Sequence, residues 1–420
     1  MKRLFALILS ILMLTGVALA TDATEPEAEL PAPVFVDATI VTKVIDEGQI
    51  VTGVRLEWDI EFLAGQLTTS SFAVNGYTII GLYINNDGVW KHAETAGKYV
   101  FLEFEEPAGI GTGTYNTLQY KEGSNLLRDL TIDIQCFYDM NLYTATGYIH
   151  TEVDDYLALS ETNDDYTTPY RLFIPEGWEN ASLPLVIWLH GGGERGDNNH
   201  SQLAANRGAL NFSDVDAQAQ NPCFVLAPQA QSTGWDGESL VNIESIVRSL
   251  IDDYNIDGAR IYVSGCSMGG SGSKSLMYAY PDMIAASLVT ANGRFTDVEE
   301  EIQILSEIPV WLITAADDSG GAAGETVAEN VEFIRSLGYN LVAFLDNDGL
   351  NGFLRGEDAA IDARRVIEAA EAADSIMLVS TYKVGTVLPA AHWSWMAATD
   401  NTAVHDWLFS QVNEAPYPAQ

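Results

Sequence analysis

Hydrophobic and polar residues alternate along the first third of the chain. Between Val54 and Phe62, apolar side chains occupy every second position, and arginine or acidic residues lie between them. A period of two is typical of a half-buried β-strand. Similar runs occupy residues 77 to 84, 98 to 105 and 130 to 137. Because Asn- and Gly-rich turn signals separate these runs, the pattern predicts a β-sandwich of immunoglobulin type that ends near residue 150.

The pattern changes from about Tyr170, where continuous apolar runs alternate with amphipathic ones. The predicted strands are "YRLFIP", "PLVIWLHGGG", "CFVLAPQ", "RIYVSGCSMGG" and "PVWLITAADD", and "SLVNIESIVRSLIDDY" is a predicted helix. Continuous apolar strands are typical of sheets that are covered on both faces. The sequence therefore predicts an α/β fold with a mostly parallel sheet flanked by helices. In such sheets the chemistry lies at the carboxyl ends of the strands.

Four segments follow from these patterns. They are a signal peptide over residues 1–20, an acidic linker over 21–33, an immunoglobulin-like sandwich over 34–150 and an α/β domain over 151–420. A chain of 420 residues exceeds one typical domain. We expect no catalytic residue in the sandwich, and we expect it to shape the substrate site or to serve as structural support, with carbohydrate binding as the alternative.

The first twenty residues have the composition of an export signal. Lys2 and Arg3 precede an uncharged apolar run from Leu4, and small residues around Ala20 form a cleavage site. The pattern predicts a secreted protein with no membrane association after cleavage. The alternative is a retained anchor, for which the apolar run is on the short side.

Charge and cysteine content restrict the partners. Twenty basic residues against fifty-nine acidic ones give a formal net charge of −39, which disfavours binding to nucleic acid or anionic lipid. Cys136, Cys223 and Cys266 are too few and too scattered for a disulfide framework or a zinc site. We therefore expect free thiols, no metal and no cofactor, and the sequence leaves the oligomeric state open.

The strongest candidate chemistry is in the segment Gly265-Cys266-Ser267-Met268-Gly269. It fits G-x-S-x-G, in which a strand turns directly into a helix and the crowded turn leaves room only for tiny side chains at the two glycine positions, on either side of the exposed serine. A predicted strand precedes it and a predicted helix follows. The alternative is an ordinary tight turn.

A serine nucleophile needs a base and an acid that orients the base. In this kind of fold they follow the serine in the order acid, then histidine. Asp317 and Asp318 end a predicted strand, and we prefer Asp318 as the acid. His392 lies in a loop whereas His405 lies in a predicted helix, so His392 is the predicted base.

Ester hydrolysis also requires backbone N–H groups that stabilise an oxyanion. We predict these donors at Gly192, Gly193 and Met268, because "LHGGGERG" supplies glycine backbone at the end of a strand. A phosphate-binding loop would need a different glycine spacing and a following lysine. Trp235 and Trp393 are predicted to bind substrate through their rings, with core packing as the alternative. The segment 346–374 is a candidate cover for the site.

These motifs resemble those of a known group of enzymes. Residues from about 168 to 411 look like α/β-hydrolase esterases of the feruloyl esterase and polyhydroxybutyrate-depolymerase-like group, in particular exported bacterial ones with an immunoglobulin-like domain ahead of the hydrolase. The resemblance implies the α/β-hydrolase fold, with Ser267 as nucleophile, Asp318 as acid and His392 as base. Thr314-Ala315 and Ala391 depart from the histidine and glycine residues common in the group, but no catalytic group is lost.

The sequence therefore predicts an exported serine carboxylesterase. Its expected substrates are short-chain, acetyl or feruloyl esters, including esters on plant polysaccharide. A serine peptidase of the same fold and a polyester depolymerase are the alternatives, the latter requiring an open site. A binding protein without activity is disfavoured, because the G-x-S-x-G turn (the nucleophile elbow), the acid, the base and the glycine loop are all present.

Overall fold

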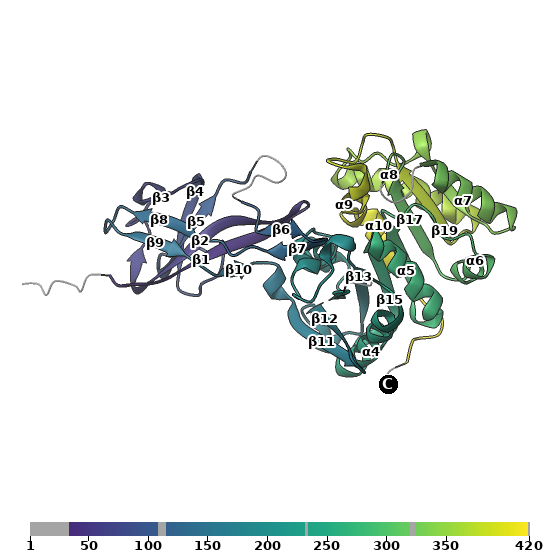
Figure 1. Cartoon of the computed structure of the whole chain (residues 1–420), viewed down its shortest axis with the longest axis horizontal. Coiled ribbons are helices and arrows are strands. Elements are labelled where there is room, and N and C mark those ends of the chain that lie inside the picture. Colours follow the sequence, from purple (N-terminus) through teal and green to yellow (C-terminus); the bar gives the residue numbers. More distant parts are fainter. Residues whose placement is uncertain (1–32, 108–114, 232–233, 320–323, 419–420) are drawn as a thin grey trace, which may run out of the picture.

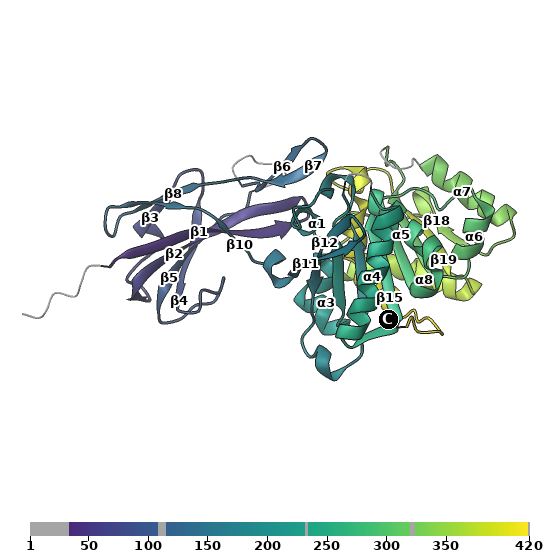
Figure 2. The same ribbon diagram turned by 60° about the horizontal axis from the view of Figure 1, so that its bottom comes forward.

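The computed structural model describes residues 33–107, 115–231, 234–319 and 324–418. The predicted signal peptide and all but the last residue of the predicted linker lie outside these ranges. An all-β domain and an α/β domain lie end to end (Figures 1 and 2). The β-strand of residues Tyr148–His150 ends the first domain, and the next strand begins at Leu157. The predicted fold class, a β-sandwich followed by an α/β domain, is confirmed.

The N-terminal domain consists of two facing sheets and a separate hairpin. Its strands are β1 (Phe35–Ile45), β2 (Gly48–Leu63), β3 (Phe72–Val74), β4 (Ile79–Asn85), β5 (Ala96–Phe104), β6 (Leu118–Lys121), β7 (Ser124–Leu127), β8 (Ile132–Cys136), β9 (Leu142–Ala145) and β10 (Tyr148–His150). The sheets have the orders β10-β1-β2-β5-β4 and β3-β8-β9. The alternating run from Val54 lies in β2, and its Leu56 and Trp58 are buried in the core between the sheets.

Strands β6 and β7 form the hairpin, which stands apart from both sheets. Glu122 and Gly123 connect them, with φ values of 54° and 88°. Two residues at positive φ are typical of a type I′ turn, whose twist suits a two-residue hairpin. Ser201 of the α/β domain donates a hydrogen bond to the Asn125 carbonyl. The hairpin therefore reaches from the N-terminal domain onto the α/β domain.

The α/β domain contains a nine-stranded sheet of order β11-β12-β14-β13-β15-β16-β17-β19-β18. The strands are β11 (Leu157–Asn163), β12 (Tyr166–Phe173), β13 (Leu183–Leu189), β14 (Phe224–Pro228), β15 (Ile256–Cys266), β16 (Ala286–Thr290), β17 (Val310–Ala315), β18 (Val342–Phe344) and β19 (Met377–Tyr382). Strands β11 and β12, at one end of this order, are antiparallel to their neighbours, and the other pairings are parallel. The carboxyl ends of the parallel strands therefore meet at one edge of the sheet.

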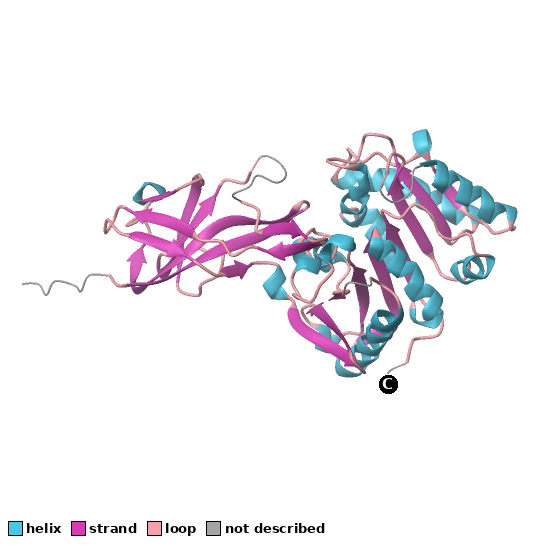
Figure 3. Ribbon diagram, viewed as in Figure 1, coloured by secondary structure: helices cyan, strands magenta, loops and turns pink. Residues whose placement is uncertain are grey.

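Helices cover both faces of this sheet (Figure 3). They are α1 (Ser201–Ala204), α2 (Leu210–Ser213), α3 (Val215–Gln220), α4 (Gly237–Asp253), α5 (Met268–Ala279), α6 (Glu299–Leu305), α7 (Gly324–Ser336), α8 (Gly356–Ala373), α9 (Ser394–Thr399) and α10 (Thr402–Phe409). Helices α4 to α7 pack on one face, and α1, α2 and α8 to α10 on the other. In β13, Val186 and Trp188 face one layer and Ile187 faces the other, which explains its continuous apolar sequence.

The two domains share buried contacts. Val44 of β1 and Leu118 of β6 belong to the same apolar cluster as the α/β core. The Arg207 guanidinium donates to the Val44 carbonyl and to Glu152, at 2.9 Å each. The N-terminal domain is therefore fixed on the α/β domain by apolar and polar contacts. Among the described residues, no helix has the length and apolar character that crossing a membrane requires.

Candidate active site

The turn between β15 and α5 places Ser267 at the carboxyl edge of the sheet. Strand β15 ends at Cys266 and helix α5 begins at Met268. Ser267 therefore occupies the turn alone, with φ of 55° and ψ of −112°. This conformation is costly for a residue with a side chain, and such strain is concentrated at functional sites. Its N–H donates to the Thr290 carbonyl at 3.0 Å, which ties the turn to β16.

The glycines of this segment are required by close backbone packing. A Cβ atom on Gly269 would lie 1.8 Å from the Leu189 carbonyl oxygen, and one on Gly265 would lie 2.4 Å from the Gly269 carbonyl oxygen. No side chain fits at these distances. The first turn of α5 therefore packs directly against the end of β13, and Ser267 projects from the turn.

Three predicted side chains form a hydrogen-bonded series. His392 Nε2 lies 2.9 Å from Ser267 Oγ, and His392 Nδ1 lies 2.8 Å from Asp318 Oδ2. Asp318 is completely buried, whereas the His392 side chain is 30% exposed. His392 lies in a short 3₁₀ helix, Ala391–Trp393, ahead of α9. The structure therefore brings together serine, imidazole and carboxylate from three separate segments.

Asp317 and His405, the alternatives for the acid and the base, make other contacts. Asp317 accepts a hydrogen bond from the Gly385 N–H at 2.9 Å. His405 is buried, stacks on Phe212 and has Nε2 2.7 Å from the Thr399 carbonyl. Burial lowers the pKa of His405 to about 4. Both residues therefore support the fold, and the arrangement at Ser267 contains Asp318 and His392.

The glycine-rich loop after β13 faces Ser267. Gly192 and Gly193 begin a short 3₁₀ helix, Gly192–Glu194. A Cβ atom on Gly192 would meet no atom within 4 Å, so this position borders open space. Met268 is the first residue of α5, where helix N–H groups have no partner within the helix. Gly192, Gly193 and Met268 thus lie on the segments that border Ser267.

Two buried side chains, His190 and Trp235, support this loop through hydrogen bonds. Burial lowers the pKa of His190 to about 4, so the ring is neutral near pH 7. Its Nε2 accepts from the Ala230 N–H at 2.9 Å, and its Nδ1 lies 2.6 Å from the Gly191 carbonyl. Trp235 donates from its indole N–H to the His190 carbonyl at 2.9 Å. The predicted substrate-binding Trp235 is therefore a buried support of the loop and does not line the cavity.

A cavity of about 610 Å³ opens at Ser267. Its α/β-domain wall contains the glycine loop from Gly191 to Arg195, and also Ser267, His392, Trp393 and Trp395. The predicted Trp393 thus does line the cavity, and Trp395 packs edge-on against the His392 ring at 5.7 Å between centroids. A volume of this size is within the range of small-molecule sites.

The N-terminal domain supplies the opposite wall. The lining residues from that domain are Asp46, Glu47, Asn116, Leu118, Tyr120 and Asn125. They come from the β1–β2 turn and from the β6–β7 hairpin with the residues before it. None of these residues was predicted to line the site, because the alternating pattern of a strand does not indicate what a distant hairpin contacts.

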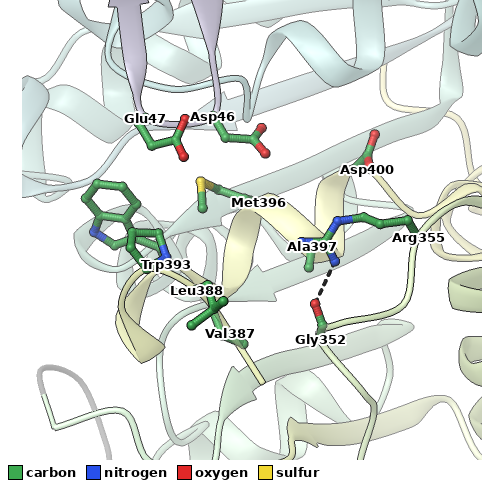
Figure 4. A pocket seen from close by; sticks show the side chains of 11 residues that line it. Asp46, Glu47, Gly352, Arg355, Val387, Leu388, Trp393, Met396, Ala397 and Asp400 are labelled. Atoms are coloured by element: carbon green, nitrogen blue, oxygen red, sulfur yellow. Dashed lines mark hydrogen bonds between the residues drawn. The ribbon is translucent and has the colours of Figure 1, made fainter. Parts of the chain in front are cut away.

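Figure 4 shows a second chamber, of about 290 Å³. It adjoins the first, because Asp46, Glu47 and Trp393 line both chambers. Across the second chamber lie Arg355, which donates to the Gly352 carbonyl, and Asp400 (Figure 4). Gly352 and Arg355 belong to the segment 346–374, so this predicted cover borders the second chamber. Among the described residues, no group of three or more His, Cys, Asp or Glu side chains is arranged to hold a metal ion.

Comparisons with known proteins agree with this architecture. Residues 37–148 match the family model described as the immunoglobulin-like N-terminal domain of esterases. A solved structure titled as that of a thermostable esterase is 28% identical, with a TM-score of 0.69. The matched region covers 90% of this chain and 99% of the chain of that esterase. The chain therefore shares both domains, in this order, with that esterase.

Curated relatives match part of the chain. The probable feruloyl esterase C of Aspergillus flavus is 28% identical over 135 residues, which are 31% of this chain and 48% of that protein. The poly(3-hydroxyalkanoate) depolymerase C of Paucimonas lemoignei is 27% identical over 164 residues, which are 37% of this chain and 39% of that protein. The matched stretch thus spans less than half the length of these relatives.

Proposed function

We propose that this chain, an esterase-type α/β-hydrolase with an N-terminal immunoglobulin-like domain, is a serine carboxylesterase in which Ser267 is the nucleophile, His392 the base and Asp318 the acid. The observation that carries the proposal is the series Ser267–His392–Asp318, with contacts of 2.9 and 2.8 Å. A serine hydroxyl becomes nucleophilic when an oriented imidazole accepts its proton.

The proposed reaction uses these three side chains in turn. Ser267 Oγ attacks the ester carbonyl while His392 Nε2 takes its proton, and the buried Asp318 carboxylate stabilises the imidazolium. Backbone N–H groups of Gly192, Gly193 and Met268 are the proposed donors to the oxyanion. His392 then protonates the leaving alcohol. Water, activated by the same imidazole, releases the acid from Ser267.

The shape of the cavity supports esters with a sizeable alcohol. The leaving oxygen must receive its proton from His392, so the alcohol extends on the His392 side. Trp393 follows His392 in the chain and borders the second chamber. That chamber therefore offers room for an alcohol such as a sugar unit, while the first chamber takes an acetyl or feruloyl group. This arrangement supports esters on plant polysaccharide as the substrate class.

A polyester depolymerase is the second candidate, and the partial match to the Paucimonas lemoignei protein favours it. The hairpin wall opposite Ser267 disfavours it, because a polymer surface requires an open site. A serine peptidase would use the same residues. A panel of methyl ferulate, an acetylated sugar, a polyhydroxybutyrate film and a chromogenic peptide amide separates these activities.

The first experiment compares the purified protein lacking residues 1–20 with its Ser267→Ala variant on 4-nitrophenyl acetate. We expect turnover by the wild type and a fall of roughly 10⁴-fold or more in the variant. Equal rates in the two proteins would contradict the assignment of Ser267. A matched control is Ser271→Ala, one helical turn further along α5, which should keep its activity.

We also propose that the protein is exported, on the basis of the charged, apolar and small-residue pattern of residues 1–20. Expression of the full chain in a bacterial host tests this. The expected mature protein begins at Thr21 and is found outside the cytoplasm. An uncleaved chain in the membrane fraction would instead favour the retained anchor.

A further inference from the structure

The contact between the hairpin and the glycine loop is centred on one buried carboxyl group. Glu194, the last residue of the 3₁₀ helix after Gly191, is 7% exposed. Its Oε1 accepts a hydrogen bond at 3.0 Å from the Asn125 side-chain amide, which belongs to β7 of the N-terminal domain. The Gly191 N–H also stabilises the carboxylate. One carboxyl group thus connects the N-terminal domain to the backbone that borders Ser267.

The hairpin also packs directly on the loop. A Cβ atom on Gly193 would lie 3.1 Å from the Asn125 side-chain nitrogen and 3.6 Å from a Tyr120 ring carbon. The Glu194 carbonyl accepts from the Gln229 amide at 2.9 Å, and Arg195 donates to the Gly192 carbonyl at 2.8 Å. The loop is therefore held by a bond within itself and by Gln229, and Asn125 adds a polar contact from the N-terminal domain.

We propose that Asn125 is a positioning residue for ester hydrolysis: through the Glu194 carboxyl it fixes the backbone from Gly191 to Gly193 opposite Ser267. This inference rests on the proposed function, because the loop is assigned there as an oxyanion donor. Oxyanion donors act through fixed placement, and a displacement of about 1 Å can cost ~10²-fold in rate.

Attachment of the two domains does not require this amide. Arg207 binds the Val44 carbonyl, and His200 Nε2 lies 3.1 Å from Gln49 Oε1. These contacts, with the buried Val44 and Leu118, lie outside the Asn125–Glu194 pair. Loss of the Asn125 amide should therefore loosen the loop while the domains stay attached.

The charge of Glu194 gives a second way to test the contact. Burial raises the pKa of this carboxyl to about 7, and the bonds from Asn125 and Gly191 oppose the increase. In the Asn125→Asp variant a second carboxyl would face it. Above the pKa values of the pair both groups are charged and repel, whereas at lower pH one proton shared between them restores a hydrogen bond.

The test measures kcat and KM for 4-nitrophenyl acetate in Asn125→Ala, with Asn141→Ala as the matched control. Asn141 lies in an exposed turn of the same domain, and its side-chain amide contacts the Tyr143 hydroxyl at 3.4 Å and the Asp139 carboxylate, both of them in that domain. We expect kcat to fall ~10- to 100-fold in Asn125→Ala, with KM within about threefold and unchanged domain attachment. In Asn141→Ala both constants should stay at the wild-type values. An unchanged kcat in Asn125→Ala would overturn the inference.

Asn125→Asp supplies a readout that a purely structural role would not change. Its kcat relative to the wild type should fall as the pH rises from 5 to 8, because the two carboxyls lose their shared proton. A constant ratio would contradict the proposal. The Glu194→Gln variant keeps the size of the side chain, and we expect it to remove this pH dependence when combined with Asn125→Asp. If Asn125→Ala does not fold, the pH dependence of kcat in Asn125→Asp, with and without Glu194→Gln, tests the positioning role.

The rate at which a neutral alkyl fluorophosphonate labels Ser267 separates this inference from the proposed function. Labelling uses the serine, the imidazole and the oxyanion donors, but no carboxylic ester. If the wild type is labelled but hydrolyses no ester, the proposed function fails and slower labelling of Asn125→Ala still supports the positioning role. If Asn125→Ala is labelled as fast as the wild type, the positioning role fails. A wild type that is not labelled at all overturns both.

Discussion

Asp318 Oδ2 lies 2.8 Å from His392 Nδ1, although 74 residues separate them in the sequence. The contact follows from the way the chain turns after β17. The Asp318 N–H bonds back to the Ala315 carbonyl at 3.1 Å, and the side chain is completely buried. Asp317, its neighbour, turns outward to the Gly385 N–H. A tight turn at the strand end thus separates the environments of two adjacent carboxylates.

This difference predicts opposite results from the same substitution. Asp318→Asn should lower kcat by roughly 10³- to 10⁴-fold, because an amide cannot stabilise the imidazolium and favours the wrong tautomer. Asp317→Asn leaves a side chain that still accepts from Gly385, so kcat should stay within about threefold. Ester hydrolysis measured on both variants at one pH checks the pair. A larger loss of kcat in Asp317→Asn than in Asp318→Asn would show that Asp317 is the acid.

The elbow itself gives a prediction about stability. The Gly269→Ala change places a Cβ 1.8 Å from the Leu189 carbonyl oxygen, which forces α5 away from β13. We expect a loss of about 1 to 3 kcal/mol in the free energy of unfolding together with lower kcat. Gly338→Ala is the comparison, because its Cβ would meet no atom within 4 Å, although its φ is 92°. Urea unfolding of both variants should show the larger loss at Gly269, and equal losses would argue against the close contact.

Much of this architecture was accessible from local sequence patterns. The alternating run from Val54 indicates β2, and the apolar run from Leu183 indicates a strand covered on both faces. The placement of Ser267 between a strand and a helix follows from the glycines beside it, because their spacing has a steric cause. The order of acid and histidine then reduces the choice to a few residues. In each case the signal lies within the segment that adopts the structure.

The contribution of the N-terminal domain to the cavity has no such local signal. The "KEGS" turn at residues 121–124 could have indicated a hairpin, since Glu122 and Gly123 both adopt positive φ. Nothing in that turn indicates that Asn125 meets Glu194, which is 69 residues away. Trp235 does not line the cavity, because its indole packs against Gly272 of α5. The sequence around Trp235 does not indicate this contact with a distant segment. Contacts between distant segments depend on packing of the whole chain.

Buried neutral histidines predict how stability depends on pH. Burial lowers the pKa of both His190 and His405 to about 4 in the folded protein, below the usual 6.5. The unfolded chain therefore binds more protons between these values, and the stabilisation present above pH 6.5 should be lost as the pH falls towards 4. Glu194 acts in the opposite sense, because its raised pKa adds stability that is lost as the pH rises towards 7.

Unfolding midpoints in urea between pH 4 and 7 check this balance. Burial also lowers the pKa of His200 to about 3 and raises the pKa values of the Asp46, Glu152, Asp155 and Asp400 carboxyls, so groups of both signs contribute to the wild-type profile. His405→Gln removes one titrating ring away from the active site, so the stability of the wild type relative to this variant should fall as the pH is lowered from 6.5 towards 4. A variant with the same pH dependence as the wild type would show that His405 is not neutral when folded.

The same substitution at two tryptophans should separate support of the loop from contact with substrate. Trp235→Phe removes the indole N–H that binds the buried His190 carbonyl, so we expect a loss of about 1 to 3 kcal/mol in the free energy of unfolding. Trp393 is only half-buried and borders both chambers. Trp393→Phe should therefore change stability by less than about 0.5 kcal/mol. It should instead raise KM for an acetylated sugar more than KM for methyl acetate, because only the larger alcohol reaches the second chamber. Equal changes in both KM values would show that the alcohol does not extend past Trp393.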